Sequence, residues 1–329
     1  MGDDWGKDAT RRAKAARIDP SVPNIARVGD YLDGGRNNFE ADRKAARALV
    51  AAAPVVGTIG PAARAFHQRV VRYLAAEAGI RQFIDIGTGL ATSGNTHEVA
   101  QSADPACRIV YVDNDPMVLA HARALMKSAP AGAISFVDAD VHDPATIMAD
   151  AREALDFGQP VAVMLLFTLA HVETAARAAA IISAMMAAVP SGSHLAMYHL
   201  ASDLDPALPA VVRRWNRQSA LRVTLRSRAE VAALVAGLDP ISPGLVPVCE
   251  WRPAPTDPRF EDVVPVHAVV ARKPKSRGSQ ALQWCGVAGS RGDDGRDGAR
   301  PGRGRPAGQH AHARARLRAD RRGSAELPR

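Results

Sequence analysis

The stretch RQFIDIGTG, from Arg81 to Gly89, decides the fold of this chain. An apolar run carries one acid, Asp85, and breaks at Gly87-Thr88-Gly89, after which the helix-forming segment LATSGNTHEVA follows. This order predicts a buried strand, a glycine turn and a helix whose N-terminal amides point into a ligand site. Glycine suits the turn because the backbone there approaches a ligand closely and often adopts a positive φ angle. The three turn residues are therefore candidate ligand contacts.

Strand and helix patterns alternate after this turn. Strands are expected at 82–86, 108–113, 134–138, 160–167 and 193–199. Helices are expected near 95–103, 116–128, 144–155, 174–189 and 227–236. Two late strands, 245–251 and 264–271, are joined by a Pro-rich link that is too short for a crossover helix, so an antiparallel hairpin at the sheet edge is expected. The pattern predicts a seven-stranded, doubly wound, Rossmann-like α/β sheet with helices on both faces.

The segments outside the sheet differ from it in composition. Residues 1–17 are charged and are expected to be flexible, whereas 18–80 are expected to form an N-terminal helical cap. Residues 81–274 then form the ligand-binding domain. Residues 275–329 are rich in Gly, Arg, Pro and Ala without periodicity, which is typical of a disordered tail. Such a tail is either a functional basic arm or a read-through extension, because a GC-rich coding region read out of frame has the same bias.

The net charge of +8 lies entirely in this tail. Its residues include 13 Lys/Arg and 5 Asp/Glu, whereas the residues before it contain 29 of each kind. A neutral body argues against a duplex-binding surface there, so nucleic acid is expected only through the tail, where Trp284 alone offers base stacking. Three scattered cysteines indicate neither a disulfide framework nor a zinc site, and no metal is expected.

Neither a secretion signal nor a membrane span is predicted. The N-terminus, MGDDWGKDATRRAK, has no apolar h-region. The longest apolar run, Val161 to Ala170, is about half of what a membrane span requires. A cytoplasmic protein without membrane association is therefore expected.

Asp85, two residues before the first glycine, separates two classes of ligand. A dinucleotide fingerprint requires Gly or Ala three residues after the second glycine, where this chain has Thr92. A carboxylate at position 85 repels a pyrophosphate but attracts a ligand with an ammonium and a sulfonium group. The sequence therefore favours S-adenosylmethionine over a dinucleotide. The alternative is that Asp85 only caps the turn.

Acids also end the second and third strands. Asp113 is placed to accept both ribose hydroxyls, with Asn114 beside the adenine, and Asp115 is expected to cap the next helix. Asp140 is expected to accept the adenine amino group while the amide of Val141 approaches a ring nitrogen. Because parallel strands end at one edge of the sheet, these acids are expected to lie together where open α/β sheets bind ligands. Each acid taken alone is equally consistent with a solvated loop residue.

The methyl acceptor is expected to lie beside the end of the fourth strand. Phe167 and His171 fall at or just past that end, and Phe167 is a candidate cofactor contact. His171 is a candidate base or substrate hydrogen-bond partner, although a loop histidine is also compatible with a structural role. Tyr31 is a second catalytic candidate. The segment around it is expected to fold as a lid over the strand ends, with Arg27 pairing with the methionine carboxylate. The alternative for Arg27 is a structural salt bridge or cap.

Several long stretches resemble an actinobacterial S-adenosyl methyltransferase family that was formerly classified as a domain of unknown function. They read IDPSVPNIARVGDYLDGGRNNFEADR (18–43), YLAAEAGIRQFIDIGTGL (73–90), NTHEVAQ (95–101), IVYVDNDPMVLAHARAL (109–125) and WRP (251–253). The broader similarity is to class I Rossmann-like methyltransferases. The resemblance implies that S-adenosylmethionine is held by Asp85, Gly87, Gly89, Asp113 and Asp140.

Three departures from the family pattern fall in the cap or on the acceptor side. Gly29 stands where tyrosine is usual, Ala63 stands where asparagine is common, and LAHVET at 169–174 replaces the usual LHxVPD. Methyl transfer to a small-molecule acceptor by in-line displacement is the expected function. A catalytically degenerate sensor or scaffold that binds S-adenosylmethionine is the alternative, and an oxidoreductase is disfavoured by Asp85 and Thr92. The sequence leaves the acceptor and the oligomeric state open.

Overall fold

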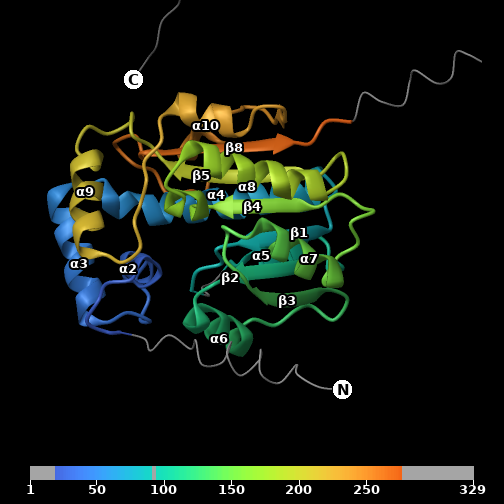
Figure 1. The fold of residues 1–329 in the computed structure, drawn as a ribbon, viewed down its shortest axis with the longest axis horizontal. Helices are drawn as coiled ribbons and strands as arrows, with labels where there is room; N and C mark the ends of the chain where they lie inside the picture. The colour runs from blue at the N-terminus through green and yellow to red at the C-terminus, as the bar shows by residue number, and fades with distance from the viewer. Residues whose placement is uncertain (1–18, 91–93, 276–329) are drawn as a thin grey trace, which may run out of the picture. The chain divides into compact units, whose positions relative to one another are not determined.

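The computed structural model describes residues 19–90 and 94–275, and a mixed sheet runs through them. The expectations for residues 1–17, for Thr92 and for the tail from 276 onward lie outside the described residues. The strands are β1 (Gln82–Ile86), β2 (Arg108–Asp113), β3 (Ala133–Asp138), β4 (Ala162–Leu166), β5 (His194–Leu200), β6 (Asp239–Pro240), β7 (Val246–Pro247) and β8 (Val266–Arg272). Their order is β3-β2-β1-β4-β5-β8-β6, and β7 also pairs with β8 (Figure 1). The predicted doubly wound α/β class is confirmed.

Strands β1 to β5 are parallel, and β8 runs antiparallel to β5. The strand order reverses between β1 and β4, which is the position where open α/β sheets bind their ligands. All five residues of β1 are buried, as expected for a central parallel strand covered on both faces. The cavity described below lies at this reversal.

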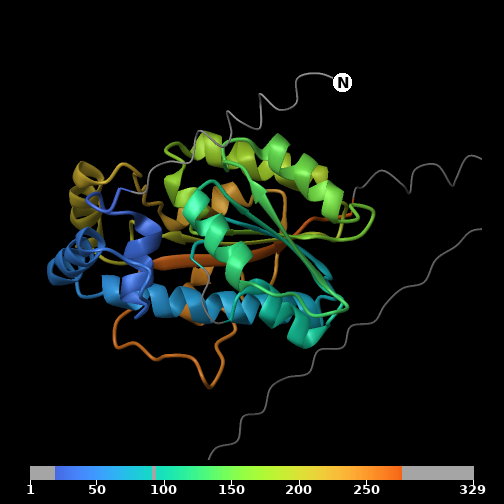
Figure 2. The same cartoon turned by 90° about the horizontal axis from the view of Figure 1, so that it is seen from below.

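Helices cover both faces because successive residues of a strand point to opposite sides. Phe83 of β1 belongs to a core cluster with α4 (Val56–Arg72) and α5 (Thr96–Ala103). Ile84, the next residue, belongs to a second cluster with α7 (Pro144–Ala154) and α8 (Ala175–Ala188). In Figure 2, α4 runs along one face of the sheet while α8 covers the other. The remaining helices around the sheet are α6 (Pro116–Leu125) and α10 (Arg228–Leu234).

The N-terminal helices are α2 (Ile25–Leu32), α3 (Glu40–Ala52) and α4, which continues into a π-helical turn at Tyr73–Glu77. They share one hydrophobic cluster with the sheet, since Val28, Leu49 and Phe66 pack in the same cluster as Phe83. Figure 1 places α2 and α3 beside α9 (Leu208–Gln218) at the carboxyl ends of the parallel strands. The cap predicted over residues 18–80 is thus helical and stands next to the ligand-binding edge.

Two elements differ from the sequence-based expectations. The strand expected at 245–251 is limited to β7 and then becomes a 3-10 turn at Val248–Glu250, because Pro247 has no N–H to continue the ladder. Its partner β8 is not at the edge of the sheet but lies between β5 and β6. The sequence analysis also omitted α9, although Leu208, Val211 and Trp215 recur at helical spacing and are buried.

Among residues 19–90 and 94–275, no single helix has both the length and the apolarity needed to cross a membrane. Helix α3 and the helical segment Val56–Glu77 meet the requirement only together, and they are bent by 104° at the break between them.

Candidate functional site

A cavity of about 500 Å³ lies at the carboxyl ends of β1, β2 and β4. Its wall combines the glycine turn after β1, the ends of β2 to β5, and residues of α2, α4 and α9. This volume is in the usual range of pockets that bind small molecules and cofactors. The cavity therefore occupies the edge at which the sequence predicted a ligand.

The glycine turn forms one side of the cavity. Gly87 and Gly89 have φ angles of 79° and 66°, in the left-handed region that favours glycine. A Cβ atom on Gly87 would lie 2.4 Å from Oγ1 of Thr168, the residue that follows Phe167 after β4. The turn is thus in close contact with the residues that follow β4. Glycine is favoured at position 87 both by the positive φ angle and by this contact.

Asp85 is a buried carboxyl group in the cavity wall, 6% exposed. Thr96 Oγ1 donates a 2.6 Å hydrogen bond to its Oδ2, and His67 Nε2 lies 2.7 Å from the same hydroxyl. Because the one hydroxyl proton of Thr96 goes to Asp85, Nε2 of His67 donates to Thr96. Burial raises the pKa of Asp85 to about 6, and the charge of Asp113 acts in the same direction while the Thr96 hydrogen bond opposes it. A positively charged ligand group beside Asp85 relieves this unfavourable burial.

Asp113 faces the same cavity from the end of β2. Its Oδ2 accepts a 3.2 Å hydrogen bond from the amide of Gly89, and its Oδ1 accepts one of 2.9 Å from the amide of Asp115. Burial raises the pKa of Asp113 to about 6, although these backbone hydrogen bonds oppose the rise. β1 and β2 are neighbours in the sheet, which brings Asp85 and Asp113 into one wall. The turn and the two acids form a single polar surface.

The end of β3 extends this surface. Asn114 Nδ2 donates a 2.8 Å hydrogen bond to Oδ2 of Asp140, while the amide and Nδ1 of His142 contact Oδ1 at 2.9 and 2.7 Å. Burial favours a higher pKa for Asp140, but the hydrogen bonds from His142 and Asn114 outweigh it and the pKa is lowered. Val141 is buried in the wall beside it. An ionised Asp140 next to an apolar residue suits the amino edge and ring of a purine.

Helix α2 reaches across to this surface through Asn24, its N-cap residue. Asn24 Nδ2 lies 3.5 Å from Oδ2 of Asp115. Asp115 caps α6 as predicted, because its Oδ1 accepts a 2.8 Å hydrogen bond from the amide of Met117. The N-terminal helix and the end of β2 therefore meet over the cavity, which is the position that a lid requires.

Phe167 and His171 line the cavity beyond β4. Phe167 has a φ angle of 76°, a strained conformation for a non-glycine residue that is typical of functional sites. Its ring packs edge-on against His171, with centroids 5.2 Å apart. Nδ1 of His171 donates a 2.9 Å hydrogen bond to the carbonyl of Arg222, which leaves Nε2 as the acceptor nitrogen. Burial lowers the pKa of His171, so the ring is neutral near pH 7.

Arg226 fixes the turn that carries His171. It is buried, and its guanidinium donates to the carbonyls of Leu169 and Val172 at 2.8 and 2.7 Å. The amide of Thr224 donates a further 2.7 Å hydrogen bond to the carbonyl of Ala170. The altered LAHVET segment is thus held in a defined conformation by several hydrogen bonds.

Two predicted site residues require correction. Arg27 is 4% exposed, and its Nε donates to Oδ2 of Asp42 at 2.7 Å while NH2 donates to the carbonyl of Val22 at 2.7 Å. It is not part of the described cavity wall, so its geometry matches the structural salt bridge and not a carboxylate-binding role. Tyr31 also lies outside the described wall, and its hydroxyl interacts with Arg47. The lid segment is polar because its side chains organise its own turns.

The sequence analysis did not identify a second group of wall residues, which come from α2, α4 and β5. NH2 of Arg64 lies 3.1 Å from Oδ2 of Asp33, and Arg64 is the only arginine or lysine in the described part of the wall. Tyr198 of β5 lies in the same wall, and burial raises the pKa of its phenol. The signal in the sequence was Arg64 and His67, three residues apart on one face of a helix.

The chain as a whole is similar to known proteins. Residues 11–274 match a family model described as S-adenosyl methyltransferase. The crystal structure of a DUF574 family protein from Streptomyces avermitilis MA-4680 is similar at 38% identity and a TM-score of 0.75, over 78% of this chain and 100% of that one. A candidate methyltransferase from Thermobifida fusca YX has 38% identity and a TM-score of 0.70, over 77% of this chain and 96% of its own. No curated protein matches.

Proposed function

Since this chain belongs to the S-adenosyl methyltransferase family, we propose that it moves a methyl group from S-adenosylmethionine to a small-molecule acceptor by in-line displacement. The methyl donor and the Rossmann-like fold follow from the family. What we propose beyond the family is the class of the methyl acceptor and the in-line geometry of methyl transfer. The observation that carries it is the placement of two acids, the buried Asp85 and the partly buried Asp113, in one cavity beside a glycine turn.

The residues of the wall fit S-adenosylmethionine group by group. Asp113 accepts one hydrogen bond from the amide of Gly89 and one from the amide of Asp115, and the remaining lone pairs of its carboxylate suit the ribose hydroxyls. Asp140 and Val141 suit the adenine, as the sequence predicted. Asp85 suits the ammonium group, because a cationic neighbour stabilises its ionised form. Arg64 takes the place that we had predicted for Arg27 and suits the methionine carboxylate.

The cofactor supplies, when bound, a methyl group on a positively charged sulfur. The contribution of the chain is to bind and align. Holding an acceptor in line with the methyl carbon is worth about 7–11 kcal/mol of the barrier in well-oriented systems. The lid formed by α2, with Asn24 against Asp115, excludes water from the cavity.

His171 is the group that accepts a proton in this proposal. Its Nδ1–H is committed to the carbonyl of Arg222, so Nε2 carries the free lone pair. Burial keeps the ring neutral and able to accept a proton near pH 7. A base at this position contributes typically ~10²–10⁴-fold to the rate. Phe167, packed against the ring, limits its rotation.

Calorimetry with S-adenosylhomocysteine and NAD in parallel tests the ligand class. We expect binding of S-adenosylhomocysteine alone, and at least a tenfold loss of affinity in Asp113→Ala. The matched control is Asp262→Ala, which removes an exposed acid far along the chain from the site. Preferential binding of NAD would refute the proposal.

Turnover is tested separately, because a degenerate protein also binds the cofactor. Release of S-adenosylhomocysteine is measured over a panel of small acceptors with wild type and His171→Ala. We expect release with wild type and a loss of about 10²-fold or more in the variant. Tight cofactor binding without methyl loss over the whole panel would favour the sensor or scaffold, for which the comparisons give no support.

A further inference from the structure

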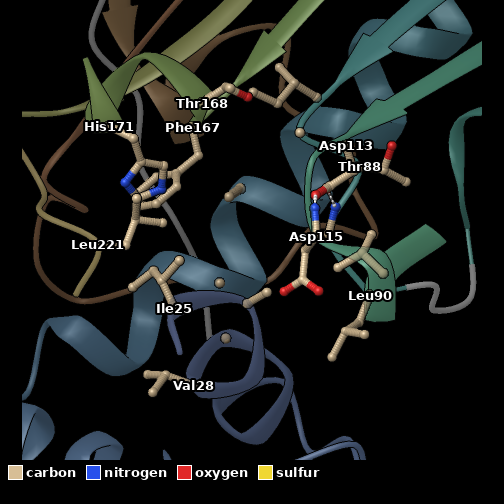
Figure 3. A pocket seen from close by; sticks show the side chains of 18 of the residues that line it. Ile25, Val28, Thr88, Leu90, Asp113, Asp115, Phe167, Thr168, His171 and Leu221 are labelled. Atoms are coloured by element: carbon tan, nitrogen blue, oxygen red, sulfur yellow. Dashed lines mark hydrogen bonds between the residues drawn. The ribbon is translucent and has the colours of Figure 1, made fainter. Parts of the chain in front are cut away.

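The cavity is divided into a charged half and an apolar half. In Figure 3, Asp113, Asp115 and Thr88 lie on one side together with Leu90, while Phe167, His171, Leu221, Ile25 and Val28 lie on the other. The charged half matches the groups of the cofactor. The cofactor assignment uses none of these apolar side chains, and their chemistry indicates what else the cavity accepts.

The apolar half is built from three distant parts of the chain. Ile25 and Val28 come from α2, Phe167 follows β4, and Trp215 with Leu221 comes from α9 and the loop after it. These five side chains are aliphatic or aromatic, whereas Asp30 of α2 and Thr168 and His171 after β4 are the polar residues that the same parts add to the wall. Burying an apolar ligand against such a wall is favourable in proportion to the apolar area removed from water.

Hydrogen bonds within α9 and its loop hold this wall in place. Trp215 is 2% exposed, and its Nε1 donates a 3.1 Å hydrogen bond to the carbonyl of Leu221. The side-chain amide of Asn216 makes two 2.8 Å hydrogen bonds with the backbone of Val223. The apolar half is therefore preformed, which lowers the entropy cost of binding a rigid ligand.

Charged groups of the described wall near this half are already paired. The carboxylate of Asp30 accepts hydrogen bonds from Asn37 and Asn38, both at 2.8 Å. Arg64, which pairs with Asp33, is assigned to the methionine carboxylate of the cofactor and is therefore not available to the acceptor. A charged ligand placed against the apolar half would lose its hydration without gaining a partner, which is costly. The wall thus discriminates against charged acceptors.

His171 lies in this half, and its Nε2 keeps a free lone pair because Nδ1–H is bonded to the carbonyl of Arg222. Nε2 favours a methyl acceptor that carries a hydrogen-bond donor. A hydroxyl group on a ring provides this donor for His171, and the ring itself packs against the apolar wall. The aromatic rings of Phe167, Trp215 and Tyr198 favour a ring over an aliphatic chain, because aromatic pairs gain energy beyond their buried area.

We infer that the acceptor is an uncharged aromatic small molecule whose ring hydroxyl is directed at Nε2 of His171, and that the product is its methyl ether. This inference rests on the proposed function. In the reaction the hydroxyl oxygen forms a bond to the methyl carbon, and the carbon–sulfur bond breaks with its electron pair going to sulfur. The hydroxyl proton passes to Nε2 of His171, which releases it to solvent after the product leaves.

The test uses protein saturated with S-adenosylhomocysteine and three uncharged phenols, namely phenol, 2-naphthol and 4-phenylphenol, each compared with its ring-sulfonated analogue. Calorimetry is expected to detect binding of at least one phenol and at least tenfold weaker binding of the matching sulfonate. With S-adenosylmethionine in place of the product cofactor, mass spectrometry is expected to detect the methyl ether of the phenol that binds.

Two variants locate the binding. Leu221 is 42% exposed, so Leu221→Asp adds a charge to the apolar wall without removing a core side chain. We expect at least a tenfold loss of phenol affinity with unchanged affinity for S-adenosylhomocysteine. The matched control is Leu125→Asp, at an exposed leucine outside the described wall, which is expected to change neither affinity.

The outcomes separate this inference from the proposed function. Failure of S-adenosylhomocysteine to bind would overturn the proposed function. Binding of S-adenosylhomocysteine together with failure of all three phenols, or with sulfonates that bind as well as the phenols, would overturn the inference alone. Unchanged phenol affinity in Leu221→Asp would overturn it as well.

Discussion

Thr96 Oγ1 lies 2.6 Å from Oδ2 of Asp85 and donates a hydrogen bond to a carboxyl group that is nearly cut off from water. One hydrogen bond does not compensate for this burial, and the pKa of Asp85 is raised to about 6. Asp113, in the same wall, has a pKa raised to about 6 for the same reason. Near pH 6 both acids are therefore partly protonated before the cofactor arrives.

Cofactor affinity is expected to rise with pH through about 6. An ammonium group favours the ionised form of Asp85, so binding at lower pH must first remove a proton. We expect the affinity for S-adenosylhomocysteine to fall at least several-fold between pH 7.5 and pH 5, measured by calorimetry. Asp85→Asn is expected to bind about tenfold more weakly at pH 7.5 and to show a shallower pH dependence. Equal affinity at both pH values in wild type would contradict the role of Asp85.

Three histidines with lowered pKa values are expected to make the fold sensitive to acid. Burial lowers the pKa of His67, His194 and His199 to about 4 from an ordinary value of 6.5. The unfolded chain then binds protons before the folded protein does, so their contribution to stability is present above pH 6.5 and is lost as the pH falls toward 4. The raised pKa values of Asp85 and Asp113 act in the opposite sense, favouring the folded state below pH 3.8 and losing that contribution as the pH rises through 6.

Urea unfolding between pH 7 and pH 4.5 measures the balance of these effects. We expect the free energy of unfolding to decrease over this range in wild type. His194→Gln removes one titrating group on β5, where Nδ1 has no hydrogen-bond partner, and is expected to reduce the slope. A variant slope as steep as that of wild type would show that His194 does not contribute.

Gly87→Ala is expected to damage both stability and cofactor binding. The positive φ angle costs an L-residue about 1–2 kcal/mol, and the added methyl group meets Oγ1 of Thr168 at 2.4 Å. Gly79→Ala is a matched control, because Gly79 has a φ angle of 71° but, apart from its chain neighbours, no described residue has an atom within 4 Å of its Cβ position. It is expected to lose only the conformational part of the stability and to retain full affinity for S-adenosylhomocysteine. Equal effects of the two substitutions on that affinity would argue against a close approach at Gly87.

Much of the fold was readable from the sequence because its signals are local. β1 and β2 have the predicted bounds, since each is an apolar run that ends in an acid and a turn. The region after β5 was harder to predict. A buried face at helical spacing was overlooked at α9, and the β7 ladder is cut short by Pro247.

Part of the site could also be predicted from the sequence, because its signals are local as well. The acids at the ends of β1, β2 and β3 occur next to strand endings, so their meeting in one wall follows from a parallel sheet. No comparable rule predicts which residues of the N-terminal helices face the cavity. Whether Arg27 or Arg64 faces the cavity depends on how α2 and α4 pack, and the partner of Arg27 is Asp42, 15 positions away. Residue type alone could not distinguish the two arginines.

Substitution of these two arginines is expected to have opposite consequences. Arg64 is partly exposed beside Asp33, so Arg64→Met should cost little stability but remove the partner of the methionine carboxylate. We expect at least tenfold weaker binding of S-adenosylhomocysteine and unchanged binding of 5′-methylthioadenosine, which has no carboxylate. Arg27→Met leaves Asp42 buried without its cation, and breaking a buried pair costs about 3–5 kcal/mol in unfolding experiments. Equal weakening of both nucleosides in Arg64→Met would mean that Arg64 shapes the cavity and does not recognise the carboxylate.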